Sequence, residues 1–268
     1  MPPDPAKLAL NTATIREQWS LAQAIEGCAR HGIRGIAPWR DKLAAMGVKE
    51  AAKAIRSHSL AVTGLCRGGF LTAEDWKDDN LRAIDEAHAL GARCLVLVVG
   101  GLPAGSKDLA GAREKVKEGI AAILPQARQA GVPLAIEPLH PMQAAERACI
   151  NTLEQALDLC DGVGEGVGVA VDVYHVWWDP KLEQQIKRAG ATRLLAYHIC
   201  DWLVPTRDTL NDRGMMGDGV IDLPRIRGWM EAAGYDGAHE VEIFSTLDWW
   251  RRDADEVLAV CKERHRAT

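Results

Sequence analysis

The sequence predicts a single α/β domain folded as a (β/α)8, or TIM, barrel. Its 268 residues are close to the roughly 250 that such barrels use. Eight times along the chain, a short apolar run rich in β-branched residues precedes a longer stretch with helical periodicity. No linker rich in proline or serine divides the chain, so we expect one barrel domain over residues 1–268.

The eight expected strands are short apolar runs, most of which end near a polar residue. They are Leu8 to Thr12, Gly35 to Pro38, Ala61 to Cys66, Cys94 to Val99, Pro133 to Glu137, Gly168 to Val173, Leu194 to Ile199 and Ala238 to Ile243. Regular alternation of strand and helix requires a parallel sheet with right-handed crossovers, and eight units close into a barrel. A doubly wound open sheet is the alternative. It is disfavoured because GGLPAGS, after the fourth strand, matches neither nucleotide-loop pattern.

The segments between the strands have the periodicity of amphipathic helices, as in SLAQAIEGCARHG and LRAIDEAHALG. Several of them end at a glycine, the residue that favours a helix C-cap. The expected helix-to-strand turns therefore contain Gly32, Gly91, Gly131, Gly190 and Gly234. The longest irregular stretch runs from Asp201 to Ile221, which in a barrel places it on the catalytic face.

Composition limits the classes of partner. The formal net charge is -5 and no long run of Lys or Arg is present, which argues against nucleic acid. No apolar run approaches the roughly 20 residues of a membrane span, and the amino terminus has no export signal. Seven cysteines without a CxxC pair indicate reduced thiols. We expect a cytoplasmic protein without a membrane partner, and a homo-oligomer remains compatible with this composition.

Four of the expected strands end in side chains that bind metals. They are Glu137 in AIEPLHP, Asp172 in VDVYHVW, His198 in YHICDW and Glu242 in HEVEIFS. Because the carboxyl ends of neighbouring strands meet at one end of a barrel, these side chains should converge. Three carboxylates and one imidazole suit a divalent cation. We expect Mn2+, with Mg2+, Co2+ and Zn2+ as alternatives.

Each residue alone also has an ordinary structural interpretation. A strand-end carboxylate can cap the next helix, and a single histidine can be a satisfied core residue. Four such residues on consecutive apolar strands are harder to explain, because burying these charges costs several kcal/mol unless a cation offsets it. The pattern therefore favours a metal site over a binding protein that has lost its site.

The motifs AIEPLHP, VDVYHVW, HICDW and GDGVIDLPRIRGWMEAAGYDGAHEVEIFS, in this order, resemble the xylose isomerase-like superfamily of sugar isomerases, epimerases and inosose dehydratases. The resemblance is strong in the carboxyl-terminal half of the chain. In the amino-terminal half it rests only on the alternation of expected strands and helices. It implies four metal ligands, which are Glu137, Asp172, His198 and Glu242. It also implies that the two glutamates form the acid/base pair.

The resemblance further implies that His175 and Arg213 bind the substrate. Because Arg213 lies on a long loop, we also expect that loop to order when substrate arrives. Two features depart from the simple epimerases. The loop from His198 to Arg213 is longer, and the substrate-binding glutamate expected after the first ligand is replaced near Gln143. These departures bear on which substrate the protein binds more than on whether it binds a metal.

Three further residues are candidates for substrate binding. The indole of Trp39 follows a strand end, where it can stack on a sugar face. His140 follows a Glu-Pro turn and either reaches the substrate or has no role there. Arg67, at the end of the third strand, either binds a carboxylate or phosphate or makes a structural ion pair. Asp201 and Glu240 are expected to support the ligands from behind.

These observations predict isomerisation or epimerisation of a small carbohydrate, either a keto-sugar or a related polyol. A metal-bound carbonyl acidifies the neighbouring proton, which Glu137 and Glu242 then remove and return through an enediolate. Which glutamate is the base stays open. The alternative is a metal-dependent dehydratase or lyase, either inosose dehydratase-like or β-eliminating from a 3-keto-glycoside. A third hypothesis, an endonuclease IV-like nuclease, is disfavoured by the acidic charge.

Overall fold

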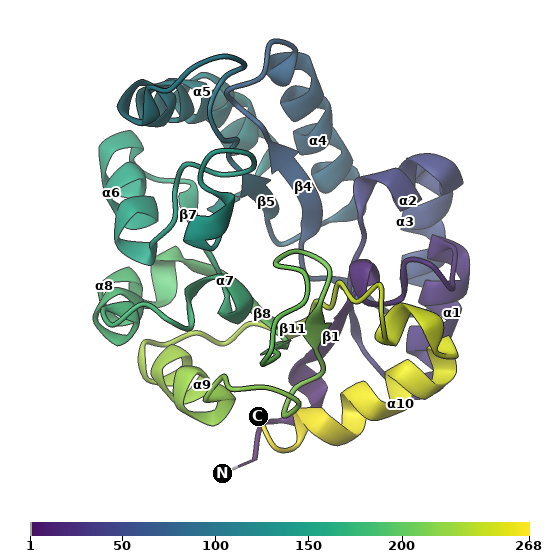
Figure 1. Ribbon diagram of the computed structural model, residues 1–268. Helices are drawn as coiled ribbons and strands as arrows, with labels where there is room; N and C mark the ends of the chain where they lie inside the picture. Colours follow the sequence, from purple (N-terminus) through teal and green to yellow (C-terminus); the bar gives the residue numbers. More distant parts are fainter. Residues whose placement is uncertain (1) are drawn as a thin grey trace.

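The computed structural model describes residues 2–268, and its strands form a parallel barrel surrounded by helices (Figure 1). The strand order is β3-β2-β1-β11-β8-β7-β6-β5-β4. The barrel strands are β1 (Leu8–Asn11), β2 (Gly35–Ala37), β3 (Ala61–Val62), β4 (Leu65–Gly69), β5 (Leu95–Val98), β6 (Leu134–Ile136), β7 (Val167–Asp172), β8 (Leu194–Ile199) and β11 (His239–Val241). The predicted α/β barrel is thereby confirmed.

The third predicted strand is wrong in detail, because it divides into two. β3 pairs with β2, whereas β4 pairs with β5 and continues to Gly69. The barrel approaches closure at this point, where Cys66 N donates to Pro38 O over 3.0 Å and Cys66 bridges Trp39. Gly69 has a φ of 109°, and a Cβ there would lie 2.0 Å from Val98 O. Only glycine allows β4 to pack this closely against β5.

The helices cover the outside of the barrel. They are α1 (Leu21–His31), α2 (Arg40–Met46), α3 (Val48–Ser57), α4 (Trp76–Leu90), α5 (Leu109–Ala130), α6 (Leu153–Val163), α7 (Val173–Val176), α8 (Leu182–Arg193), α9 (Leu223–Ala232) and α10 (Ala254–His265). Short 3-10 helices are η1 (Pro5–Lys7), η2 (Thr12–Ile15), η3 (Pro141–Gln143) and η4 (Trp249–Arg251). Among the residues described, no helix is both long and apolar enough to span a membrane.

The predicted glycine caps are mostly confirmed. Gly32, Gly91 and Gly131 are left-handed C-caps of α1, α4 and α5, with φ of 68°, 66° and 68°. Gly234 follows the C-cap of α9 with a φ of 89°. Gly190 differs, because it lies inside α8, where its φ of 57° and ψ of -177° interrupt the helical path.

The barrel interior holds small side chains. The main apolar cluster packs the strands against the helices, whereas a separate buried cluster consists of Cys66, Cys94, Val96, Ala135, Ala170 and Ala196. All seven cysteines are buried and free. The interior near the carboxyl ends of the strands is instead occupied by buried polar side chains, among them Asn11, Glu240 and His198.

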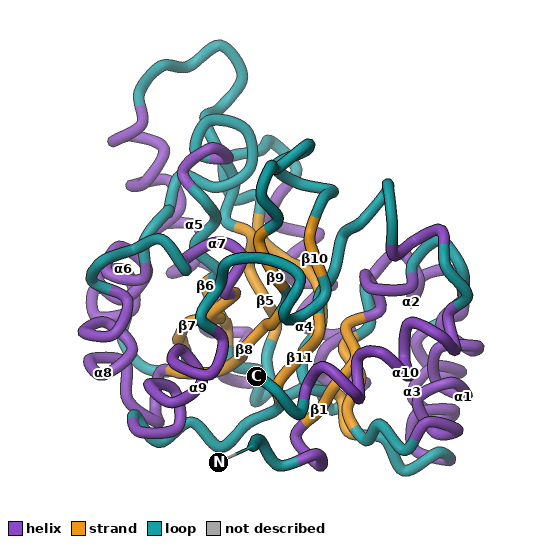
Figure 2. Tube along the Cα trace, turned by 60° about the horizontal axis from the view of Figure 1, so that its bottom comes forward, coloured by secondary structure: helices purple, strands orange, loops and turns teal. Residues whose placement is uncertain are grey.

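The stretch predicted to be irregular after β8 contains a small antiparallel ribbon of β9 (Asp201–Trp202) and β10 (Arg213–Gly214). The Asp201 carboxylate accepts the backbone N–H groups of Trp202, Gly217 and Ile221 over 2.9, 2.9 and 3.0 Å. Both of its oxygens therefore hold this loop together, rather than supporting the candidate ligands as expected. In Figure 2, loops drawn in teal extend beyond the ends of the strands at the end of the barrel where β9 and β10 lie.

Acid should destabilise the fold through two buried histidines that join β11 to α10, where His239 Nδ1 lies 3.0 Å from His265 Nε2. Burial lowers the pKa of His239 to about 3 and that of His265 to about 4. An unfolded histidine takes up its proton near pH 6.5, so below that pH the unfolded chain binds more protons. Their contribution to stability is therefore present above about pH 6.5 and is lost as the pH falls toward 4.

The expected slope approaches about 1.4 kcal/mol of unfolding free energy per pH unit for each histidine. Urea unfolding between pH 7 and pH 4.5 measures it. His265→Gln should unfold with a shallower pH dependence, whereas His58→Gln, at an exposed histidine, should match the unmodified protein. An unchanged slope in His265→Gln would contradict the role of this pair.

Candidate metal centre

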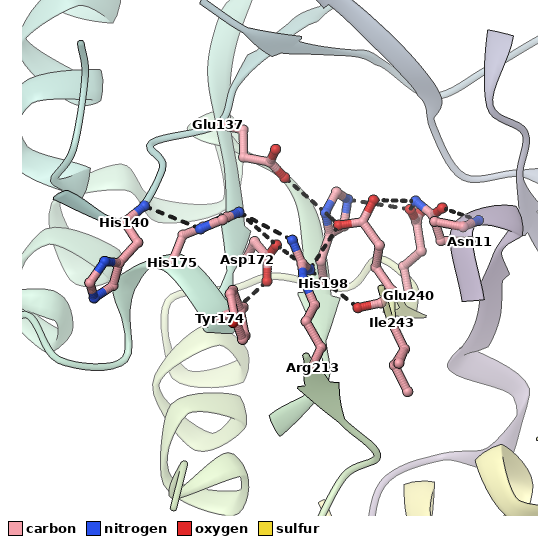
Figure 3. Close-up of polar contacts among 12 residues, drawn as sticks. Asn11, Glu137, His140, Asp172, Tyr174, His175, His198, Arg213, Glu240 and Ile243 are labelled. Atoms are coloured by element: carbon pink, nitrogen blue, oxygen red, sulfur yellow. Dashed lines mark hydrogen bonds and ion pairs between the residues drawn. The ribbon is translucent and has the colours of Figure 1, made fainter. Parts of the chain in front are cut away.

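The four predicted ligand residues converge at the carboxyl-terminal mouth of the barrel. Figure 3 shows three of them, Glu137, Asp172 and His198, close to one another. Glu137 follows β6, Asp172 ends β7, His198 lies in β8 and Glu242 follows β11. One ligand atom from each lies within 4.8 Å of the others, and all four residues are buried. Atoms that coordinate one ion at about 2.0–2.6 Å are at most about 4–5 Å apart. The spacing therefore fits a single cation.

His198 lies in the middle of this cluster. Its Nδ1 is 3.0 Å from Glu137 Oε1 and 3.6 Å from Glu242 Oε2. Although close together, His198 Nδ1 and Glu137 Oε1 are buried without a hydrogen-bond partner among residues 2–268. A buried imidazole nitrogen and a carboxylate oxygen that face one point without a hydrogen bond are the donors that a divalent cation satisfies.

A layer of polar residues supports the cluster from deeper in the barrel. Asn11 Nδ2 donates to Glu240 Oε1 over 2.8 Å and to Glu242 Oε1 over 2.9 Å. Thr63 Oγ1 donates to Glu240 Oε2 over 2.7 Å, while Glu240 Oε1 lies 3.3 Å from His198 Nε2. Glu240 thus contacts the far side of the His198 ring, the supporting position expected for it. Sequence reasoning missed Asn11, although its polar side chain at the end of β1 was a usable signal.

The two glutamates of the cluster differ in their pKa values. Burial, together with Glu242 and Asp172, raises the pKa of Glu137 to about 7, against the opposing effect of His198. Burial alone would also raise the pKa of Glu242, but His198 and Arg213 outweigh it and lower that pKa to about 2. Burial therefore dominates at Glu137, whereas the neighbouring positive charges dominate at Glu242.

Arg213 is held more firmly than its place in a long loop indicated. Its backbone N–H donates to Phe244 O over 2.8 Å, and its guanidinium carbon lies 4.5 Å and 4.9 Å from the ring centroids of Tyr174 and Phe244. Arg213 Nη1 is 2.9 Å from Asp172 Oδ2 and 3.1 Å from Glu242 Oε2. It therefore compensates the charge of two candidate ligands, a contact that sequence reasoning did not anticipate.

His175 lies in α7, the short helix that follows Asp172. Its Nδ1 accepts the backbone N–H of His140 over 3.1 Å, and burial lowers its pKa to about 3. A neutral imidazole has only one acceptor nitrogen, whereas donors face both nitrogens of this ring: the backbone N–H of His140 at Nδ1 and Arg213 Nη2 at Nε2. Nε2 lies 3.6 Å from Asp172 Oδ2 and 3.2 Å from Arg213 Nη2, beside the cluster.

The other predicted substrate-binding residues divide into two groups. Trp39 and Arg67 line the cavity at the barrel mouth, and Trp39 Nε1 also donates to Asn11 Oδ1 over 2.8 Å. The ring of His140 is not part of the cavity wall. It stacks instead on Trp202, with ring centroids 4.9 Å apart, and points away from the cluster in Figure 3. The interpretation of His140 as a substrate contact through its ring is not supported.

The cavity has a volume of about 660 Å³ and opens to solvent next to the cluster. Its wall includes Trp39, Phe244 and Trp250 as well as several arginines. It continues inward to Glu137, His175 and Glu242. Arg147 lines both parts and was missed, because it lies in an irregular segment with no periodicity.

Fold and cluster together define an α/β-barrel protein with a site of the kind that holds a divalent cation. The chain belongs to the xylose isomerase-like TIM barrel family, whose model matches residues 25–263. The family resemblance predicted from the carboxyl-terminal motifs is thereby confirmed.

Relatives and solved structures agree with this assignment. An inosose isomerase of Bacillus velezensis is 27% identical to this chain, in an alignment that covers 97% of this chain and 96% of the relative. The crystal structure of protein SMc04130 from Sinorhizobium meliloti is 63% identical, with a TM-score of 0.96 and 98% of both chains covered. The IolI protein, solved with a bound zinc atom, shares the fold at 22% identity, with a TM-score of 0.82 and 96% of both chains covered.

Proposed function

We propose that this protein is a divalent-metal-dependent isomerase or epimerase of a small keto-sugar or related polyol. The convergence of Glu137, Asp172, His198 and Glu242 within 4.8 Å at the barrel mouth carries the proposal. The similarity to an inosose isomerase over almost the whole chain supports the reaction class. The zinc in the related IolI fold supports a divalent ion, for which Mn2+ and Zn2+ are the first candidates.

When bound, the divalent ion supplies polarisation of the substrate carbonyl and stabilises the negative charge that proton removal leaves. Glu137 and Glu242 act as the acid/base pair. One removes the proton from the carbon beside the carbonyl, and the other returns a proton to the opposite face or to the neighbouring carbon.

The other residues of the site orient the substrate and balance charge. His175 Nε2 and Arg213 Nη2 lie 3.2 Å apart beside the cluster, where both can contact a substrate oxygen. Arg213 pairs with Asp172 and Glu242 and so offsets their charge in a buried setting. Trp39 forms an apolar wall of the cavity against which a sugar face can pack.

Proton exchange with solvent tests the proposal. The protein, loaded in turn with Mn2+, Mg2+, Co2+ or Zn2+, is incubated in D2O with an inosose, with hexuloses, and with their acid and phosphate derivatives. Mass spectrometry then follows the sugar. We expect metal-dependent incorporation of deuterium without loss of mass from the carbon skeleton. Exchange that is unchanged by a chelator, or absent from every compound, would refute the proposal.

The same experiment separates the alternative chemistry. A dehydratase or lyase shares the first proton abstraction but then expels the group on the next carbon, so the product loses water or a glycosyl substituent. The long loop after β8, which contains Trp202, favours this second reaction over that of a minimal epimerase. Product mass decides between the two reactions.

A further inference from the structure

Two arginines face the cavity without a carboxylate partner. Arg67 lies in β4, and Arg147 immediately precedes Ala148, which bridges Gly100 beyond the end of β5. Both residues line the outer cavity and its inner continuation beside Glu137. Within residues 2–268 neither forms an ion pair, and the buried Nε of each has no hydrogen-bond partner.

The other arginines of the cavity wall are compensated. Arg16 Nη2 lies 2.6 Å from Asp41 Oδ2. Arg40 Nη1 lies 2.8 Å from Asp79 Oδ2, and its Nε lies 2.6 Å from Glu86 Oε2. Arg213 pairs with two carboxylates of the cluster. Arg67 and Arg147 are therefore the arginines of the cavity that have no ion-pair partner in the described part of the chain, although the more distant Glu137 acts on both charges.

The guanidinium groups of Arg67 and Arg147 lie in surroundings that disfavour positive charge. Burial, with the charge of Arg147, lowers the pKa of Arg67 to about 10, and burial also lowers the pKa of Arg147. Like charges brought together in a partly buried wall repel each other unless an anion lies nearby. Among residues 2–268, Arg67 does not form the structural ion pair that was its alternative interpretation.

The guanidinium of Arg67 lies against two aromatic rings. Its guanidinium carbon lies 4.1 Å from the ring centroid of Phe70 and 5.8 Å from that of Trp39. Aromatic rings cannot accept a full ion pair, and the buried Nε of Arg67 has no hydrogen-bond partner among residues 2–268. A guanidinium presents its N–H groups as a fork that matches a carboxylate or phosphate.

We infer that the substrate carries an anionic group, a carboxylate or a phosphate, which Arg67 and Arg147 bind on the β4–β5 side of the mouth. This inference rests on the proposed function and narrows its substrate to a keto-sugar acid or a keto-sugar phosphate. The candidate metal ligands lie on or next to β6, β7, β8 and β11. The substrate thus spans the mouth, with its anion on one side and its carbonyl on the other.

Binding of two matched compound series tests the inference. One series is D-fructose, D-fructuronate and D-fructose 6-phosphate. The other is dihydroxyacetone, hydroxypyruvate and dihydroxyacetone phosphate. Calorimetry with the Mn2+-loaded protein at constant ionic strength measures each dissociation constant. In at least one series, we expect an anionic member to bind about 10- to 100-fold more tightly than its neutral parent. Whether the carboxylate or the phosphate is preferred identifies the group.

Variants then assign the preference to the two side chains. Arg67→Gln and Arg147→Gln should each lower it by about tenfold while Mn2+ affinity stays within about threefold. Arg16→Gln is the matched control, because Arg16 lines the same cavity but is paired with Asp41. It should keep the full preference. An equal loss in Arg16→Gln would indicate general attraction by the cavity and would overturn the inference.

The unmodified protein alone can refute the idea if a glutamine variant does not fold. Absence of any anion preference in both series, with Mn2+ bound, would overturn the inference and leave the proposed function intact. Failure to bind any of the four metals would instead refute the proposed function. The two failures are therefore distinguishable in one set of titrations.

Discussion

Glu137→Gln should lower kcat by about 10²- to 10⁴-fold while Mn2+ still binds. General acid/base catalysis contributes on that order, and an amide cannot accept the proton. The amide oxygen keeps a neutral ligand in the position of Glu137 Oε1, so metal binding should weaken far less than turnover falls. Steady-state kinetics and Mn2+ calorimetry on the same preparation measure both quantities.

Glu146→Gln serves as the control for this change, because Glu146 is an exposed carboxylate nearby in the sequence. It should leave kcat and Mn2+ affinity unchanged. Small and equal losses of turnover and metal in Glu137→Gln would argue against acid/base work by Glu137, since they would indicate a ligand role alone.

His198→Ala should lower Mn2+ affinity by more than 100-fold and remove activity with it. Loss of a side chain that only supports a ligand costs roughly 10- to 100-fold, and a direct ligand should exceed that. With Mn2+ at about 1,000 times its dissociation constant, the unmodified protein gains about 4 kcal/mol of stability. We expect His198→Ala to lose most of the corresponding rise in Tm.

Glu240→Gln provides the comparison, because Glu240 contacts His198 Nε2 from behind but is not among the four candidate ligands. Its loss of Mn2+ affinity should fall within the 10- to 100-fold range. The comparison uses the Tm with and without Mn2+ for each variant, so a change in the stability of the metal-free protein does not interfere. An undiminished Mn2+ shift in His198→Ala would show that the imidazole is not a ligand.

Most of the fold follows from local patterns in the sequence. Apolar β-branched runs located the strands, and glycines such as Gly32 and Gly91 marked helix ends. The division of the third strand at Thr63 and Gly64 escaped prediction, because it depends on which neighbour each half pairs with. The β9–β10 ribbon escaped for a different reason, since strands of two residues are too short to show periodicity.

The candidate site was predictable where strand position determines geometry. Glu137, Asp172 and His198 were identifiable because a polar residue at the end of a buried strand points to the barrel mouth. Arg147 was not, since its place depends on the bridge between Gly100 and Ala148. Such tertiary pairings leave no local pattern.

The loop over the mouth has a consequence for the timing of turnover. The three hydrogen bonds to Asp201 and the backbone bond from Arg213 to Phe244 fasten this loop at both ends of its ribbon. In many enzymes a mobile lid must open before product leaves, on a microsecond-to-millisecond timescale. Because this loop is fastened beside an open cavity, we expect product departure to depend on diffusion and on how tightly the cavity holds the product, rather than on opening of this loop.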